Sequence, residues 1–151
     1  MEKVLYFPNI LAVVLSSLCL LISGLRADEG NIKSRLNISL TTDKEVYSPD
    51  DVIEMTLKVS NQSDEEITLQ FKDTQRFDFI IESNGERLWR WSDGRIFAQV
   101  IGEERLMPRQ SVIYKQKFEG KLEPGTYKLT ATVVNREIPL VTTLVIFVCA
   151  M

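Results

Sequence analysis

The sequence predicts an all-β protein built as one antiparallel β-sandwich of about seven to nine strands. Three observations lead to this fold class. Apolar and polar residues alternate through most of the chain after residue 35, turn sequences separate these runs at intervals of about ten residues, and no amphipathic helix of useful length is present. The 151 residues are enough for one domain with one core.

Residues 1–27 have the pattern of an export signal. Lys3 lies near the start, an apolar stretch runs from Ile10 to Ile22, and Ala27 ends the segment. We expect cleavage after Ala27, which would place the protein in the periplasm, outside the cell or on the cell surface. An uncleaved membrane anchor is the alternative, because Leu25 is larger than ideal at the third position before the cut.

The rest of the chain is predicted as a linker, residues 28–35, and one domain, residues 36–151. A net charge of −3 and the lack of a basic cluster argue against nucleic-acid binding. A membrane contact is expected only through residues 1–27, if they are not cleaved. Cleavage would leave Cys149 as the single cysteine, so we expect no intrachain disulfide. A monomer is expected, and a disulfide between two chains through Cys149 is the alternative.

Alternation and turn residues place the strands in order along the chain. The predicted strands cover residues 36–40, 52–59, 67–71, 77–82, 87–91, 112–118, 127–133 and 140–148. The last of these is almost continuously apolar, which predicts a buried strand, since nine residues are too few to cross a bilayer as a helix. From Ile96 to Gln110 the pattern weakens, so this segment is the leading candidate for a functional loop.

The stretch from Phe77 to Phe97 contains both tryptophans and three of the seven phenylalanines. At its centre, Asn84 and Gly85 predict a two-residue type I′ hairpin turn, because both positions of that turn need positive φ. One face of the hairpin is predicted to be core and carries Phe77, Phe79, Ile81 and Leu88. The other face carries Asp78, Ile80, Glu82, Arg87, Trp89 and Trp91.

On this register Trp89 and Trp91 point away from the core, so they must be covered by a later segment or be offered to a partner. One residue more or fewer in the loop would exchange the faces of one strand. A carbohydrate-binding module that uses the two rings is one hypothesis that follows from their placement.

The composition argues against an enzyme. The chain has no histidine, which excludes Ser-His-Asp and Cys-His catalysis and every His-ligated metal site. Acidic residues cluster at Asp50-Asp51 and at residues 64–66, in turns where solvated carboxylates are ordinary and without calcium-loop spacing. We therefore expect no catalytic residue, no metal and no cofactor.

Several motifs, in this order, resemble the BsuPI-type intracellular proteinase inhibitor family: FDFII, a glycine turn, LWRWSDGRIF, LMPRQS and LEPGTY. The resemblance extends over roughly residues 36–134. The residues that carry it are Phe77, Asp78, Phe79, Gly85, Trp89, Trp91, Ser92, Gly94, Phe97, Pro124, Gly125 and Tyr127.

The resemblance implies an immunoglobulin-like β domain that binds and inhibits a serine proteinase through a surface loop. The candidate proteinase contacts are Trp89, Trp91, Arg95, Arg105 and Met107. The chain departs from the family in its expected export and in Met107-Pro108-Arg109, where the family often has proline-glycine. A structural or adhesive module of the cell envelope, without inhibitory activity, is the alternative, because one fold hosts many functions.

Overall fold

The computed structural model describes residues 32–150 of the chain. Residues 32–35, the end of the predicted linker, form one helical turn, and the rest of the described chain is strands and loops. The strands are β1 (Leu36–Thr42), β2 (Val46–Tyr47), β3 (Ile53–Asn61), β4 (Ile67–Phe71), β5 (Phe77–Ser83), β6 (Glu86–Arg90), β7 (Gly102–Leu106), β8 (Ser111–Phe118), β9 (Gly125–Val133) and β10 (Leu140–Val148). The all-β prediction is confirmed, whereas the predicted signal segment lies outside the described residues.

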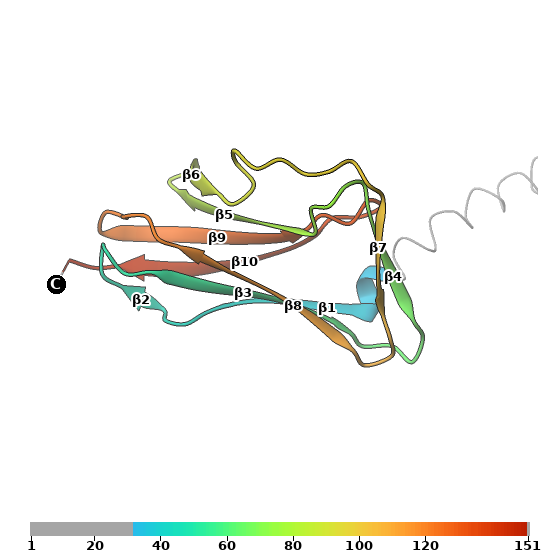
Figure 1. Ribbon diagram of the computed structural model, residues 1–151. Coiled ribbons are helices and arrows are strands. Elements are labelled where there is room, and N and C mark those ends of the chain that lie inside the picture. The colour runs from blue at the N-terminus through green and yellow to red at the C-terminus, as the bar shows by residue number, and fades with distance from the viewer. Residues whose placement is uncertain (1–31, 151) are drawn as a thin grey trace, which may run out of the picture.

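Two sheets stack as a sandwich, and a small third sheet lies at one end (Figure 1). The order in the larger sheet is β2-β10-β9-β5-β6, and in its partner β1-β3-β8. Strands β4 and β7 form the third sheet. All pairs are antiparallel except the short parallel contact of β2 with β10.

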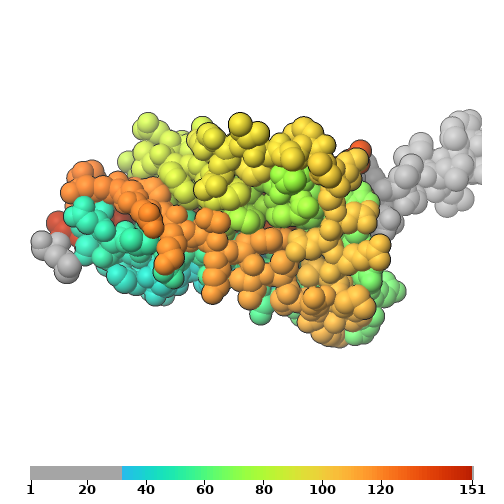
Figure 2. Space-filling model, in the orientation of Figure 1, coloured from blue at the N-terminus to red at the C-terminus, as the bar shows by residue number. Residues whose placement is uncertain are grey.

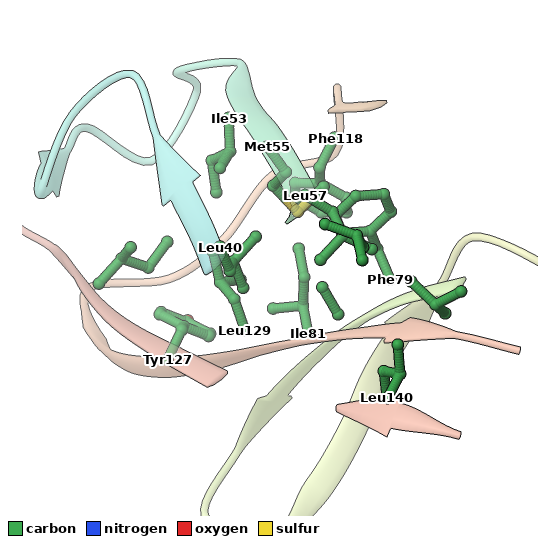
Figure 3. Packing of buried hydrophobic residues seen from close by; sticks show 14 of the residues in the cluster. Leu40, Ile53, Met55, Leu57, Phe79, Ile81, Phe118, Tyr127, Leu129 and Leu140 are labelled. Atoms are coloured by element: carbon green, nitrogen blue, oxygen red, sulfur yellow. The ribbon is translucent and has the colours of Figure 1, made fainter. Parts of the chain in front are cut away.

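The core lies between the two stacked sheets, where alternate side chains meet. Leu57 of β3, Ile81 of β5 and Leu129 of β9 are completely buried, and Figure 3 shows Ile81 and Leu129 side by side on one sheet with Leu57 facing them from the other. Burying one such aliphatic side chain contributes about 1.5–3 kcal/mol. Since period-two alternation decides which residues point inward, this part of the fold follows from the sequence.

Strand β10 differs from its prediction as a fully buried strand. Its inward residues are buried, but Val141, Val145 and Phe147 on the other face are each about half exposed. The prediction is wrong for that face, because an antiparallel sheet can leave one side open to solvent. Cys149, which follows β10, is exposed and forms no disulfide within the described residues.

The Asn-Gly turn is confirmed: Asn84 and Gly85 have φ values of 51° and 81°, and Glu82 pairs with Arg87. Beyond that pair a β-bulge inserts one residue, Leu88, so Ile81 pairs with Trp89. The insertion exchanges the faces of β6. The predicted faces are therefore wrong for Leu88 and for both tryptophans.

Leu88, expected in the core, is 47% exposed. Trp89 and Trp91 instead pack against the core, and the rings of Trp89 and Phe118 meet with centroids 5.3 Å apart. Strand β7 was not predicted, because its sequence, Gly-Glu-Glu-Arg-Leu, shows no apolar alternation. In the structure, Leu106 is the only buried residue of this strand.

Candidate functional site

The candidate site is the loop of residues 91–101, hereafter the β6–β7 loop, which runs along the outside of the sandwich from the end of β6 to β7 (Figure 1). Figure 2 shows this part of the chain in yellow along the upper surface of the molecule. The loop has no regular secondary structure after residue 94. Its shape is instead fixed by side chains at both of its ends.

Asp78 anchors the start of the loop. This side chain of β5 is buried, with 2% exposure, and its carboxylate accepts hydrogen bonds from Arg90 Nε at 2.5 Å and Ser92 Oγ at 2.8 Å. The backbone N–H of Ser92 also donates to Asp78, at 3.2 Å. Charge-assisted bonds of this kind are about twice as strong as neutral ones. The family-motif residues Asp78 and Ser92 thus join β5 to the residues that follow β6.

Trp91 lies beneath the loop and is held on several sides. Its ring centroid is 4.5 Å from that of Phe77 and 5.9 Å from that of Phe97. The guanidinium of Arg95 stacks on the indole, 4.4 Å from the ring centroid, while Arg95 Nε donates to the Trp91 carbonyl at 2.8 Å. Gly94, with φ of 72°, allows the chain to turn back over the indole in this way.

The aromatic cluster continues into the three-stranded sheet through Tyr114 of β8, whose ring centroid is 4.9 Å from that of Phe77. The hydroxyl of Tyr114 donates to a carboxylate oxygen of Glu104. Burial, together with this hydrogen bond, raises the pKa of Tyr114, so the phenol stays protonated and keeps its role as donor. Strands β5, β7 and β8 are tied together beneath the loop by these contacts.

The second half of the loop is attached to the segment before β5. Thr74 and Ala98 exchange two hydrogen bonds, from Thr74 N to the Ala98 carbonyl and from Ala98 N to Thr74 Oγ1, both 3.0 Å long. At the loop's end, a Cβ on Gly102 would lie 2.2 Å from Nη2 of Arg76. The Arg76 guanidinium thus packs directly against the backbone of Gly102, and a larger residue there would make the arginine side chain move.

Between these attachments, Ile96 projects into solvent with 98% of its side chain exposed. Val100 and Ile101 follow it with 60% and 69% exposure. Sequence reasoning missed Ile96 because it favoured charged side chains and methionine. The sequence held no signal that singled it out, because the exposure of an apolar loop residue depends on packing with distant segments.

The structure brings together only some of the predicted contact residues. Trp91 and Arg95 are in direct contact, and Trp89 lies on the neighbouring part of β6. Arg105 lies on β7, opposite Thr68, and Met107 lies beyond it in the turn before β8. Figure 1 shows that turn at the far end of β7 from the β6–β7 loop.

Residues 107–110, hereafter the β7–β8 turn, are closed by two hydrogen bonds between Met107 and Gln110. Gln110 N donates to the Met107 carbonyl at 3.0 Å, and Met107 N donates to Gln110 Oε1 at 2.9 Å. Arg109 has φ of 63°, the left-handed conformation that glycine adopts most easily. Asn61, 1% exposed, donates through Nδ2 to the carbonyls of Leu106 and Met107 at 3.0 and 3.2 Å. Arg109 thus occupies a left-handed backbone position that favours glycine.

The acidic residues of the turns form ion pairs at the surface. Asp50 pairs with Lys121 at 3.2 Å, and Asp64 pairs with Arg109 at 2.8 Å. Within residues 32–150, no group of three or more histidine, cysteine or acidic residues is arranged to hold a metal ion. In the same part of the chain, no helix is long and apolar enough to cross a membrane.

The remaining motif residues have mainly structural roles. Phe79 is buried in the core, and Tyr127 donates its hydroxyl to the Glu123 carbonyl at 2.6 Å, across the turn that contains Pro124. Gly125 begins β9, and its φ is not positive. The motif therefore describes how the hairpin and the β6–β7 loop are held.

The family model for BsuPI, described as intracellular proteinase inhibitor, matches residues 40–138. The chain belongs to the BsuPI family. The matched residues extend from β1 into the segment after β9 and include the hairpin, both loops around β7 and the Pro124–Tyr127 turn. A search of curated protein sequences gave no match.

Solved structures share the fold at low sequence identity. The sporulation control protein Spo0M from Bacillus subtilis is 14% identical, with a TM-score of 0.51 over 78% of this chain and 50% of that chain. A cycloisomaltooligosaccharide glucanotransferase from Paenibacillus sp. is also 14% identical, with a TM-score of 0.51 over 76% of this chain and 14% of that chain. A CARDB domain from Pyrococcus furiosus is 16% identical, with a TM-score of 0.46 over 77% of this chain and 94% of that one. The chain thus spans half or less of the first two proteins, and the likeness to these two concerns the fold alone.

Proposed function

We propose that the protein is an exported inhibitor that binds a serine proteinase non-covalently through the β6–β7 loop. The observation that carries the proposal is a loop held at both ends, by Trp91 and by Thr74, with the fully exposed Ile96 between them. Family membership supports a proteinase as the partner. A loop that is already ordered loses little conformational entropy on binding, so more of the contact energy is available as affinity.

Export is part of this proposal and rests on the signal pattern of residues 1–27. A secreted inhibitor would meet proteinases outside the cytoplasm, unlike the founding member of the family. Cell fractionation with an antibody against the domain tests it: the protein should be found outside the cytoplasm and begin near residue 28. Recovery of the intact chain from the cytoplasm would contradict export.

The inhibitor function is tested by titrating the purified protein against subtilisin, elastase, chymotrypsin and trypsin and measuring residual activity. A variant with Ile96, Val100 and Ile101 all replaced by serine should lose inhibition, because it removes the exposed apolar side chains and keeps Phe97 on Trp91. The matched control replaces residues 107–110 with another four-residue turn and should inhibit as the parent does. Absence of inhibition and of a complex at micromolar concentration would reject the proposal for these enzymes.

A structural or adhesive module is the second candidate. The half-exposed Val141, Val145 and Phe147 on the outer face of β10 favour it, because such apolar patches often mark contact surfaces. In contrast, the rings of Trp89 and Trp91 are engaged with Phe118, Phe97 and Arg95, so the packing gives little support to a carbohydrate-stacking role. Tryptophan fluorescence that stays constant across a glycan panel would agree with this.

A further inference from the structure

The two residues on either side of Ile96 are held against Trp91, whereas Ile96 itself contacts almost nothing. Arg95 stacks on the indole, and the ring of Phe97 packs against the same indole. Since both neighbours are fixed to one support, the backbone at Ile96 is held in place while its side chain is 98% exposed. The loop therefore presents Ile96, its most exposed apolar residue, on a fixed backbone.

Arg95 is poorly placed to enter a pocket of a proteinase. Its guanidinium lies over the Trp91 ring, and its Nε donates to the Trp91 carbonyl. To reach a negatively charged pocket, Arg95 would have to give up both interactions and release the support on one side of Ile96. Ile96, and not Arg95, is therefore the side chain that is available to a partner.

The chemistry of Ile96 suits an apolar pocket. Burial of a fully exposed aliphatic side chain removes its whole apolar surface from water, which is the main favourable term in such contacts. A β-branched side chain has few χ1 rotamers, so little side-chain entropy is lost when it is enclosed. Val100 and Ile101, also exposed, extend the apolar character along the loop.

We infer that Ile96 fills the specificity pocket of the target proteinase and that this pocket is apolar. The inference rests on the proposed function and makes it more specific, since it names the residue that selects the enzyme and the class of enzyme selected. Proteinases whose pocket carries a carboxylate for lysine or arginine, as in trypsin, are then poor targets. Enzymes with apolar pockets are the expected partners.

The experiment compares inhibition of subtilisin, elastase, chymotrypsin and trypsin by the parent protein and by three variants. Ile96→Asp should weaken inhibition of the apolar-pocket enzymes by roughly 30-fold or more, the size expected for a central contact residue. Ile96→Leu should stay within a few-fold of the parent, because it conserves volume and polarity. Ile96→Arg should shift inhibition toward trypsin.

The matched control is Ile113→Asp, which places the same charge at an isoleucine of β8 that is 52% exposed. It should inhibit as the parent does. Because the Ile96 side chain makes almost no intramolecular contact, its variants should keep the thermal unfolding midpoint of the parent, and this measurement separates lost binding from lost folding.

The possible failures differ from one another. If the parent inhibits but Ile96→Asp stays within threefold of it, the assignment of Ile96 is wrong while the inhibitor function stands. If trypsin is inhibited and Arg95→Ala removes that inhibition, the pocket is charged and the inference is overturned. If the parent inhibits none of the four enzymes, the proposed function fails and the inference falls with it.

Discussion

The two connections around β7 hold an exposed apolar side chain in different ways. The β6–β7 loop presents Ile96, 98% exposed, on a support made by the Trp91 ring and the Asp78 carboxylate. The β7–β8 turn presents Met107, 53% exposed, on a turn closed by two hydrogen bonds and braced by the Asn61 amide. One is a long loop held from below, and the other is a closed four-residue turn.

The difference shows why only one of them is a good binding element. The backbone of the β7–β8 turn satisfies its own polar groups and cannot open without breaking those bonds. The β6–β7 loop is attached near residues 91–95 and 98, which leaves a side chain free between fixed points. Ordered support beneath an exposed residue is what a rigid inhibitor requires.

The largest expected effect is that of Asp78→Ala, which should separate the two regions. It leaves Arg90 and Ser92 without their carboxylate partner and should reduce the free energy of unfolding by about 2–4 kcal/mol. Urea denaturation measures this. Asp64→Ala, which breaks only an exposed pair with Arg109 beside the β7–β8 turn, should cost less than about 1 kcal/mol. Equal costs for the two variants would contradict a structural role for Asp78.

Asn61→Ala tests the brace of the β7–β8 turn. Removing the amide takes away one hydrogen bond to the Leu106 carbonyl and one to the Met107 carbonyl, which still accepts from Gln110 N. A loss of about 1–3 kcal/mol is therefore expected in urea denaturation. Below its unfolding transition the variant should keep the inhibition constant of the parent. Asn37→Ala, an exposed site on β1, serves as the control and should be neutral. Lost inhibition in a folded Asn61→Ala would show that the turn takes part in binding.

Trp91→Phe tests the support beneath the β6–β7 loop. The buried Nε1 of Trp91 has no hydrogen-bond partner among the described residues, so the change removes ring area and weakens the stacking of Arg95 but removes no hydrogen bond. A loss of about 1–2 kcal/mol is expected, with faster hydrogen exchange in peptides that cover residues 92–101. Trp89→Phe, at the contact with Phe118, should leave exchange in those peptides unchanged. Identical exchange in both variants would argue against Trp91 as the support.

The smallest effect concerns the backbone of the β7–β8 turn. Arg109→Gly should be about 1 kcal/mol more stable than Arg109→Ala, because both variants remove the ion pair with Asp64 and only glycine is relaxed at φ of 63°. Thermal unfolding of the two variants gives the difference. If alanine proves as stable as glycine, Arg109 does not adopt the left-handed conformation in solution.

Local sequence chemistry predicted much of the hairpin. Asn84 and Gly85 gave the type I′ turn and the pairing of Glu82 with Arg87, because positive φ at two successive positions is a local requirement. The faces of Trp89 and Trp91 were predicted wrongly, because the bulge at Leu88 changes the register and no turn residue in the sequence indicates that bulge. The family motif nevertheless pointed to the right stretch of chain.

By itself, the sequence determined the β fold, the order of the long strands and the family, since alternation, turn residues and short motifs are read along the chain. Only the tertiary structure decided which side chains of the weakly patterned segment face solvent. The conformation of the loop around Ile96 depends on Phe77 of β5, which packs against Trp91, and on Thr74, which binds Ala98, and both come from a part of the chain well before the loop. Exposure is a property of packing between distant segments, and for that reason an isoleucine in a loop could not be recognised as the presented residue until the fold was known.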